Sequence, residues 1–543
     1  MAEAETELTM GQERLRSVTE SDKELLFAWT NDPVTRRQSF SQEPVKWEEH
    51  CAWFEKKIHD PGCHHYLLEA DGESVGVIRL ERCEEAITGY DANQPDMTEK
   101  NKTVEPKTCY RISYSIAPGK RGLGYGKKLL QLAEYHAALE IPDCGILAGE
   151  VKKENIASAC GVETLGYVKD QRNLFGQKDA EDPREFCFTK TIDRSRCIYF
   201  RADANESVGN GHVMRCLTIA DACRKIGMYP VFLLADEKAQ HMILKRGYLA
   251  HVFGTDYREP ETELPDYAQV VCPGAVVVAD SYFLTAAYMQ RLHDMGYRLV
   301  WLDDLGTQEY PVTCLINYNL YAEELDYSKR KKPGITYLLG AAYAPVRPVF
   351  RKKEYRVSKK LRQILITTGA GDPYHAGYLF ADALLKEDPD WEVTVICGAY
   401  HNDVEALEKL AQASEGRLRI MRNLTDLSDV MSASDLAIAA AGSTLYELCA
   451  VGVPTLVYEF ADNQHPGAEA FAKKVGSVRL GDLRTQAAQA AQTVCKEVRR
   501  LAEHEERQRI SEQMKRLSDG HGAERIAEEL ELLVRYQTEI KRV

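Results

Sequence analysis

Short apolar segments alternate with longer stretches of helical character from Cys197 onward, and this alternation limits the possible folds more than any other feature of the 543-residue chain. The segments are rich in Val, Ile and Leu, as expected of strands buried on both faces of a parallel sheet. A proline-containing connection, 333–355, separates two sets, at 197–201, 231–234, 275–279 and 298–302, and at 363–367, 392–397, 418–421, 436–439 and 455–458. The alternation predicts βα units, and the two sets predict two parallel sheets.

The first 192 residues lack this regular alternation. Alternating apolar and polar positions at 76–80 and 110–116 predict neighbouring strands in a mixed α+β domain. The polar stretch from Glu84 to Thr108 is longer than most connections, so we expect a solvated loop, with a substrate lid as the alternative.

The overall class predicted is α/β, with domains at 1–192, 197–350 and 351–543. The charged sequence after Asp482 predicts a helical tail that has one packed apolar stripe, formed by Ile526, Leu530, Leu533 and Tyr536.

Charge and cysteine usage restrict the possible partners. A formal charge of −14 argues against general nucleic-acid binding but still allows a local phosphate site. The acidic start and the lack of a long apolar run predict a cytoplasmic protein with no membrane partner. Fifteen cysteines without a CxxC pair predict reduced thiols, with neither a disulfide framework nor a metal site.

Three glycines lie between a predicted strand and a predicted helix at Arg121-Gly-Leu-Gly-Tyr-Gly126. Free amides at such a turn bind phosphates, although a purely structural turn explains the glycines equally well. The segment resembles the coenzyme A motif of the GNAT acetyltransferases, Arg/Gln-x-x-Gly-x-Gly/Ala. The segments Glu150–Ser158 and Leu165–Tyr167 also resemble that family, and Trp29–Arg36 resembles the opening of its sugar-nucleotide and ribosomal-protein branches.

This resemblance implies a GNAT α+β acetyltransferase fold with acetyl-CoA as co-substrate, bound by Arg121, Gly122, Gly124, Tyr125, Gly126 and Asn155. Val162 stands where many relatives have the tyrosine that protonates the leaving thiolate, so the general acid is unassigned. Glu150 is a candidate general base acting through water, and a surface salt bridge is the alternative for this carboxylate.

A histidine with glycine neighbours, Gly209-Asn-Gly211-His212, follows the first strand of the second region. Ligands bind at the carboxyl ends of parallel strands, and a helix N-terminus disfavours protonation of an imidazole. His212 is therefore a candidate general base, with a structural residue or helix cap as the alternative.

In the second sheet, Gly442-Ser443-Thr444 follows a strand and opens a helix. Small residues, free amides and hydroxyls there suit a diphosphate, and the missing P-loop lysine excludes an ATPase cradle. Glu447, one turn further, could accept hydrogen bonds from ribose hydroxyls or could merely complement the helix dipole.

The segments Arg201-Ala-Asp203 and Gly209–Leu217 resemble the UDP-2,4-diacetamido-2,4,6-trideoxy-β-L-altropyranose hydrolases of pseudaminic acid synthesis, which have the two-Rossmann GT-B architecture. Further matching segments are Asp280–Tyr282, Asp303–Asp304, Asn317–Asn319, Leu339–Arg347, Thr368–Pro373 and Asn463–Gln464.

The resemblance implies that His212 activates water while UDP leaves from the helix start at Gly442–Thr444, without a metal. Asp203 and Asp280 could orient the histidine or the sugar, or serve as cap or turn residues. Arg201 and Arg347 could contact phosphate or pair with those acids. The implied UDP-sugar contacts are Arg201, Gly211, Asp280, Arg347, Gly371, Gly442, Ser443, Thr444, Glu447, Asn463 and Gln464.

Together the two resemblances imply a bifunctional enzyme that acetylates the C4 amine of a UDP-linked amino-sugar and then hydrolyses the product. A GT-B glycosyltransferase, in which an acceptor hydroxyl replaces water, is one alternative. A second alternative makes the N-terminal domain a non-catalytic module that binds acyl-CoA or nucleotide-sugar. Oligomerisation stays open.

Overall fold

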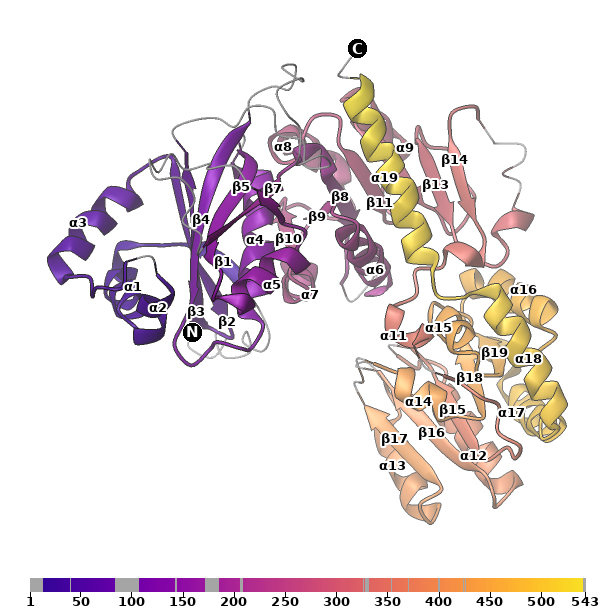
Figure 1. The fold of residues 1–543 in the computed structure, drawn as a ribbon. Coiled ribbons are helices and arrows are strands. Elements are labelled where there is room, and N and C mark those ends of the chain that lie inside the picture. Colours follow the sequence, from indigo (N-terminus) through magenta and orange to yellow (C-terminus); the bar gives the residue numbers. More distant parts are fainter. Residues whose placement is uncertain are drawn as a thin grey trace. The chain divides into compact units, whose positions relative to one another are not determined.

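The computed structural model describes residues 13–39, 41–83, 107–141, 144–170, 185–205, 209–325, 327, 332–352, 354–369, 371–398, 401–422, 424 and 426–540. Most of the loop expected between Glu84 and Thr108 lies outside these residues. The chain divides into two compact units, Met1–Cys197 with Gln240–Ala250, and Ile198–Ala239 with His251–Val543 (Figure 1).

The described part of the first unit is built on a mixed seven-stranded sheet with the order β1-β2-β3-β4-β5-β7-β6. The strands are β1 (Glu13–Ser17), β2 (Cys63–Ala70), β3 (Glu73–Arg82), β4 (Thr108–Ile116), β5 (Cys144–Lys152), β6 (Val168–Asp170) and β7 (Glu185–Thr191). The helices are α1 (Lys23–Thr30), α2 (Pro33–Gln38), α3 (Trp47–Ile58), α4 (Tyr125–Glu140) and α5 (Ile156–Thr164).

Strands β4 and β5 are parallel, whereas their neighbours pair antiparallel. The ladder between them joins Thr108–Arg111 to Cys144–Ala148, and both strands continue beyond it. The glycine turn and α4 follow the end of β4, so this turn lies next to the ends of the two strands that continue beyond their shared ladder.

From Cys197 onward the described residues form two parallel sheets. The first sheet has the order β10-β9-β8-β11-β12-β13-β14. Its strands are β8 (Cys197–Ala202), β9 (Tyr229–Leu234), β10 (Leu249–Val252), β11 (Val276–Asp280), β12 (Arg298–Leu302), β13 (Cys314–Asn317) and β14 (Thr336–Leu339). The helices are α6 (Gly211–Lys225), α7 (Gln240–Lys245), α8 (Leu264–Val270) and α9 (Ala286–Asp294).

The second sheet has the order β17-β16-β15-β18-β19-β20. Its strands are β15 (Gln363–Thr367), β16 (Glu392–Cys397), β17 (Leu418–Arg422), β18 (Leu436–Ala440), β19 (Thr455–Glu459) and β20 (Arg479–Asp482). The helices are α11 (Pro348–Arg351), α12 (Ala376–Glu387), α13 (Val404–Ala413), α14 (Ser428–Ser432), α15 (Thr444–Val451), α16 (His465–Val475), α17 (Leu483–Arg500), α18 (His504–Leu517) and α19 (Gly522–Ile540).

Both parallel sheets have the Rossmann strand order, in which the direction of chain progression reverses beside the first strand. The reversal lies between β8 and β11 in the first half and between β15 and β18 in the second. Ligands bind at the carboxyl ends of the strands at this switch point, so the fold defines one candidate site in each half.

The last helix, α19, packs on α6 and β11 of the first Rossmann half (Figure 1). Ile526 and Leu530 are buried as predicted, but Val534 is buried instead of Leu533, and the Tyr536 side chain lies outside the described residues. The predicted helical tail therefore packs against the first Rossmann half. The predicted domain limits at 350 and 351 stay a prediction.

Within the described ranges, no helix combines the length and the apolar character needed to cross a membrane.

Candidate active sites

His212 lies in the first turn of α6, directly after the switch-point strand β8. Its Nδ1–H donates to Asp280 Oδ1 at 2.5 Å, and Asp280 is the last residue of the neighbouring strand β11. The parallel register pairs Ala202 with Asp280, which brings the two side chains together at one sheet edge. Because Nδ1 carries the proton, Nε2 is the ring nitrogen able to accept one.

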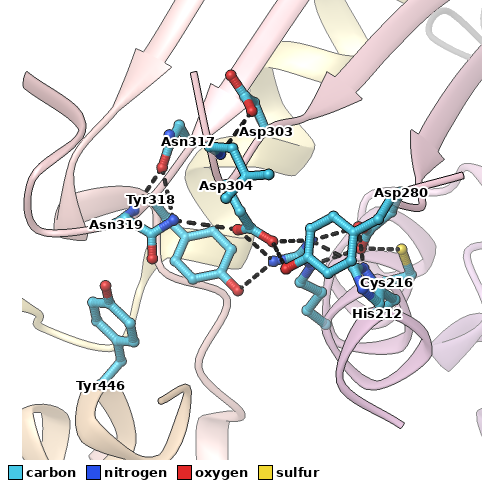
Figure 2. A network of polar contacts seen from close by, with 12 residues as sticks. His212, Cys216, Asp280, Asp303, Asp304, Asn317, Tyr318, Asn319 and Tyr446 are labelled. Carbon is cyan, nitrogen blue, oxygen red and sulfur yellow. Dashed lines mark hydrogen bonds and ion pairs between the residues drawn. The ribbon is translucent and has the colours of Figure 1, made fainter. Parts of the chain in front are cut away.

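Arg215, one turn further along α6, also donates to Asp280, which lies beside His212 in Figure 2. Its Nε donates to Asp280 Oδ2 at 2.6 Å, and its Nη1 donates to Asp304 Oδ1 at 2.9 Å. Burial favours the neutral form of Asp280, but Arg215 and His212 outweigh it and hold the pKa of this carboxyl well below its usual range. The ionised Asp280 can therefore stabilise a protonated His212.

Two tyrosines complete the surroundings of Asp304 and Arg215. Tyr282 donates to Asp304 Oδ2 at 2.8 Å, and its ring meets the His212 ring edge-on with centroids 4.7 Å apart. The Tyr318 hydroxyl accepts from Arg215 Nη1 at 2.9 Å, and burial raises the pKa of Tyr318 to about 12. Sequence reasoning gave no role to Arg215, Asp304, Tyr282 or Tyr318, although each lay in a segment that matched the hydrolases.

Arg201 pairs with Asp203, which is the ion-pair alternative predicted for this arginine. The Arg201 side chain is 0% exposed, and it donates to Asp203 and, through Nε at 2.9 Å, to Glu263. The other Asp203 oxygen accepts from Ala235 N at 2.9 Å. A buried guanidinium bound by two carboxylates cannot reach a phosphate, and Asp203 orients Arg201 instead of His212.

At the second switch point the structure gathers several predicted UDP contacts around a hollow of about 320 Å³. The predicted residues in its lining are Gly371, Gly442, Ser443, Thr444 and Gln464. Helix α15 begins at Thr444, and the amides of Leu445 and Tyr446 already donate to Gly442 O and Ser443 O. The amides of Ser443 and Thr444, at the start of the helix, are therefore the ones that would bind an anion in the hollow. The hollow can therefore hold a diphosphate by backbone amides and small side chains.

The remaining predicted residues of this half have other surroundings. Arg347 Nη2 donates to Glu447 Oε1 at 3.2 Å, and burial raises the pKa of Glu447 although Arg347 opposes it. Gln464 Oε1 accepts from Phe460 N at 3.0 Å, while Asn463 is exposed and does not line the hollow. Arg347 thus pairs with Glu447 and not with Asp203 or Asp280.

In the first unit the glycine turn has the geometry of a phosphate site. Gly122 and Gly124 have φ of 78° and 87°, which favour glycine, and Gly124 caps the N-terminus of α4. No atom lies within 4 Å of the position where either would carry a Cβ. Arg121 Nη2 donates to Asp32 Oδ2 at 2.6 Å, which ties this turn to the N-cap of α2.

The other predicted acetyltransferase residues serve local contacts. Glu150 on β5 pairs with Arg111 on β4, as in the salt-bridge alternative, and Asn155 caps α5 by accepting from Ser158 N at 3.2 Å. Val162 is buried at 5% exposure.

Tyr114 was missed in the sequence, because one hydroxyl in a strand gives no signal of its tertiary partner. It projects from β4 beyond the β4–β5 ladder, and its hydroxyl lies 2.7 Å from Ser158 Oγ in the first turn of α5. Burial raises the pKa of Tyr114, which keeps this phenol protonated.

Among the described residues, no three or more His, Cys, Asp or Glu side chains lie close enough together to hold a metal ion. The predicted metal-free mechanism stays a prediction.

Comparison with known families separates the two parts of the chain. Residues 14–168 match the model of the acetyltransferase (GNAT) domain, and residues 379–530 match the glycosyltransferase family 28 C-terminal domain. The chain joins a GNAT acetyltransferase domain to a glycosyltransferase-like domain. The predicted fold class, a GNAT fold followed by a GT-B-like pair of Rossmann domains, is thereby confirmed.

Two curated relatives are similar over part of their length. An uncharacterised protein of Methanocaldococcus jannaschii is 22% identical over 52% of this chain and 59% of its own length. A spore coat polysaccharide biosynthesis protein of Bacillus subtilis is 27% identical over 26% of this chain and 43% of its own length. The chain thus spans less than two thirds of each curated relative.

Solved structures are similar to each part separately. MurG of Acinetobacter baumannii is 12% identical and covers 62% of this chain and 99% of its own, with a TM-score of 0.46. Spermidine N-acetyltransferase from Vibrio cholerae, in complex with CoA and spermine, is 16% identical and covers 33% of this chain and 96% of its own, with a TM-score of 0.25.

Proposed function

We propose that this chain is a bifunctional nucleotide-sugar enzyme of pseudaminic acid synthesis. The first unit transfers acetyl from acetyl-CoA to the C4 amine of a UDP-4-amino-4,6-dideoxy-N-acetyl-altrosamine. The two Rossmann halves hydrolyse UDP-2,4-diacetamido-2,4,6-trideoxy-β-L-altropyranose to UDP and free sugar. The Bacillus relative is a spore coat polysaccharide biosynthesis protein, which agrees with a sugar substrate.

The observation that carries the hydrolase proposal is the buried pair of His212 and Asp280 at the first switch point. A carboxylate that accepts a hydrogen bond from Nδ1–H keeps Nε2 unprotonated and able to act as a base. The same carboxylate stabilises the imidazolium that forms when Nε2 takes a proton. A transferase that deprotonates a sugar hydroxyl could use the same pair, so the choice between water and an acceptor needs an experiment.

In the proposed reaction, Nε2 of His212 takes a proton from water as the water oxygen forms a bond to the anomeric carbon. The bond between that carbon and the β-phosphate oxygen breaks, and its electron pair leaves with UDP. The amides at Ser443 and Thr444 stabilise the charge on the diphosphate. Glu447 supports binding of the ribose.

For acetyl transfer, the amine attacks the thioester carbonyl of acetyl-CoA, and the C–S bond breaks to release a thiolate. The glycine turn at Gly122–Gly126 binds the pyrophosphate. The Tyr114–Ser158 hydroxyl pair lies where β4 and β5 diverge and supplies the proton that the thiolate needs, in the role that Val162 cannot fill. Glu150 is paired with Arg111, so the amine loses its proton to water and not to this carboxylate.

The test is incubation of the 4-amino UDP-sugar with and without acetyl-CoA, followed by mass spectrometry. We expect acetyl-CoA-dependent gain of one acetyl group, and then UDP with free diacetamido sugar. Tyr114→Phe should slow acetylation about tenfold and leave hydrolysis unchanged. No mass gain with intact acetyl-CoA binding would instead favour a non-catalytic N-terminal module.

A glycosyltransferase is the second candidate, favoured by the family 28 match over residues 379–530. In that case UDP release should depend on an added acceptor, and no free sugar should accumulate.

A further inference from the structure

Tyr446 connects the UDP hollow with the first Rossmann half. It lies on α15, between the predicted UDP contacts Thr444 and Glu447, and its side chain turns away from them into the protein, where it is 7% exposed. Its hydroxyl accepts from Leu320 N at 3.2 Å, and its ring meets Tyr318 edge-on with centroids 5.5 Å apart. Helix α15 therefore contacts the segment Tyr318–Leu320, which follows β13 (Figure 2).

The segment Tyr318–Leu320 is held by both Rossmann halves. On the side of the second half, Lys474 of α16 donates to Leu320 O at 2.6 Å, in addition to the contact with Tyr446. On the side of the first half, Asn319 Nδ2 donates to Asp304 Oδ1 at 3.2 Å. A shift of α15 or α16 would therefore move the segment Tyr318–Leu320 and, through Asn319, the Asp304 side chain.

Tyr318 carries the connection to the base. Its hydroxyl accepts from Arg215 Nη1, and Arg215 in turn holds both Asp280, the partner of His212, and Asp304. The Arg215, Asp280 and His212 side chains are 10% exposed or less, so their positions depend on one another through direct contacts rather than through water.

We propose that Tyr446 and Tyr318 are positioning residues that couple occupancy of the UDP hollow to the orientation of the His212 base. When a diphosphate binds the start of α15, Tyr446 fixes the position of the segment Tyr318–Leu320. Tyr318 then fixes the position of the Arg215 side chain, and Arg215 fixes the orientation of the Asp280–His212 pair. The inference rests on the proposed function, because it assigns UDP to this hollow and proton transfer to His212.

The first test removes one hydroxyl at a time and follows UDP release. Tyr318→Phe should lower kcat about tenfold and Tyr446→Phe about fivefold, each with KM changed less than about twofold, because the base is misplaced while the UDP contacts stay. Since both residues act through one chain of contacts, the double variant should lose about tenfold and not the product of the two losses.

The matched control is Tyr310→Phe in the same half. Tyr310 is also buried and loses two hydrogen bonds, to Gln308 Oε1 and Leu284 O, but neither partner belongs to the chain of contacts. Its kcat and KM should stay at the parent values. If Tyr310→Phe lowers kcat as much as Tyr318→Phe does, the losses report general loosening and the proposal is wrong.

The second test does not need turnover. UDP is added to protein with ¹⁵N-labelled histidine, and the imidazole signals are followed by NMR, with His212 assigned from a His212→Gln sample. UDP should shift the His212 signals in the parent and in Tyr310→Phe, and the shift should fall by more than about half in the two tyrosine variants at saturating UDP.

The outcomes separate the coupling from the function. If the parent neither binds nor releases UDP, the proposed function fails and the coupling fails with it. If the parent hydrolyses its substrate but the tyrosine variants keep full kcat and the full His212 shift, the coupling alone is wrong. A shift that persists in both variants would show that UDP acts on His212 directly.

Discussion

The two Rossmann halves place their predicted residues at the same topological position but use opposite chemistry there. At the β8–β11 switch point, charged side chains are buried and mutually paired around His212 and Asp280. At the β15–β18 switch point, glycines, hydroxyls and helix amides surround an open hollow. Under the proposed function, the first half moves a proton and the second half holds an anion.

The largest expected effect is that of His212→Gln. Loss of the base should lower kcat by about a thousandfold, while UDP binding to the second half changes less than about twofold. UDP release assays and calorimetry with UDP measure the two quantities. If His212→Gln keeps the turnover of the parent, or loses UDP affinity to the same extent as turnover, the assignment of the base to the first half and of UDP binding to the second half is wrong.

Asp280→Asn should have the next largest effect, lowering kcat about a hundredfold because the imidazole loses its orienting charge. The pKa of Asp280 is below its usual value, so its stabilising effect is present above the unfolded pKa of about 4 and is lost as the pH falls below that value. The thermal midpoint of the parent should therefore fall more steeply below about pH 4 than that of Asp280→Asn. Equal slopes in the two proteins would contradict the buried charge.

Gly442→Val tests the hollow alone. Gly442 does not need a positive φ and no atom lies within 4 Å of its Cβ position, so the new side chain enters the hollow without backbone strain. We expect UDP to bind about twentyfold more weakly, with circular dichroism and the acetyltransferase reaction unchanged. Undiminished UDP affinity would place the diphosphate elsewhere.

Glu447→Ala should have the smallest effect, a loss of UDP affinity of about fivefold, because one hydrogen-bonding carboxylate is removed while the amides of α15 remain. If Glu447 contacts the ribose, the variant should also bind UMP and uridine about fivefold more weakly than the parent does, as measured by calorimetry. An unchanged dissociation constant would leave Glu447 as a partner of Arg347 only.

The features that sequence analysis found are those determined by a few neighbouring residues. His212 and Gly442–Thr444 each follow a strand and open a helix, so the local pattern was enough to locate them. In the two parallel sheets the longer apolar strands were found for the same reason, whereas the short strands β10, β13, β14 and β20 were not predicted. In the first unit only β3 and β4 were predicted from their alternating pattern.

The partners of these residues depend on distant parts of the chain. The register of β8 and β11 brings Asp280 to His212, and Glu263, which holds Arg201, is 62 residues away in the sequence. The sequence therefore could not decide between the alternatives for Arg201 and Asp203, because it shows a charge but not whether another charge already neutralises it. Tyr446 was missed because its role depends on contact with a segment more than a hundred residues earlier.

The most direct test of the central claim follows the oxygen of water. Hydrolysis of the diacetamido UDP-sugar in H₂¹⁸O, analysed by mass spectrometry, should place the label at the anomeric carbon of the free sugar and leave UDP unlabelled. His212→Gln should form neither product at a comparable rate. Label in UDP would mean attack at phosphorus, and UDP release only in the presence of an acceptor would mean transfer; either result would contradict a water-activating first half paired with a UDP-binding second half.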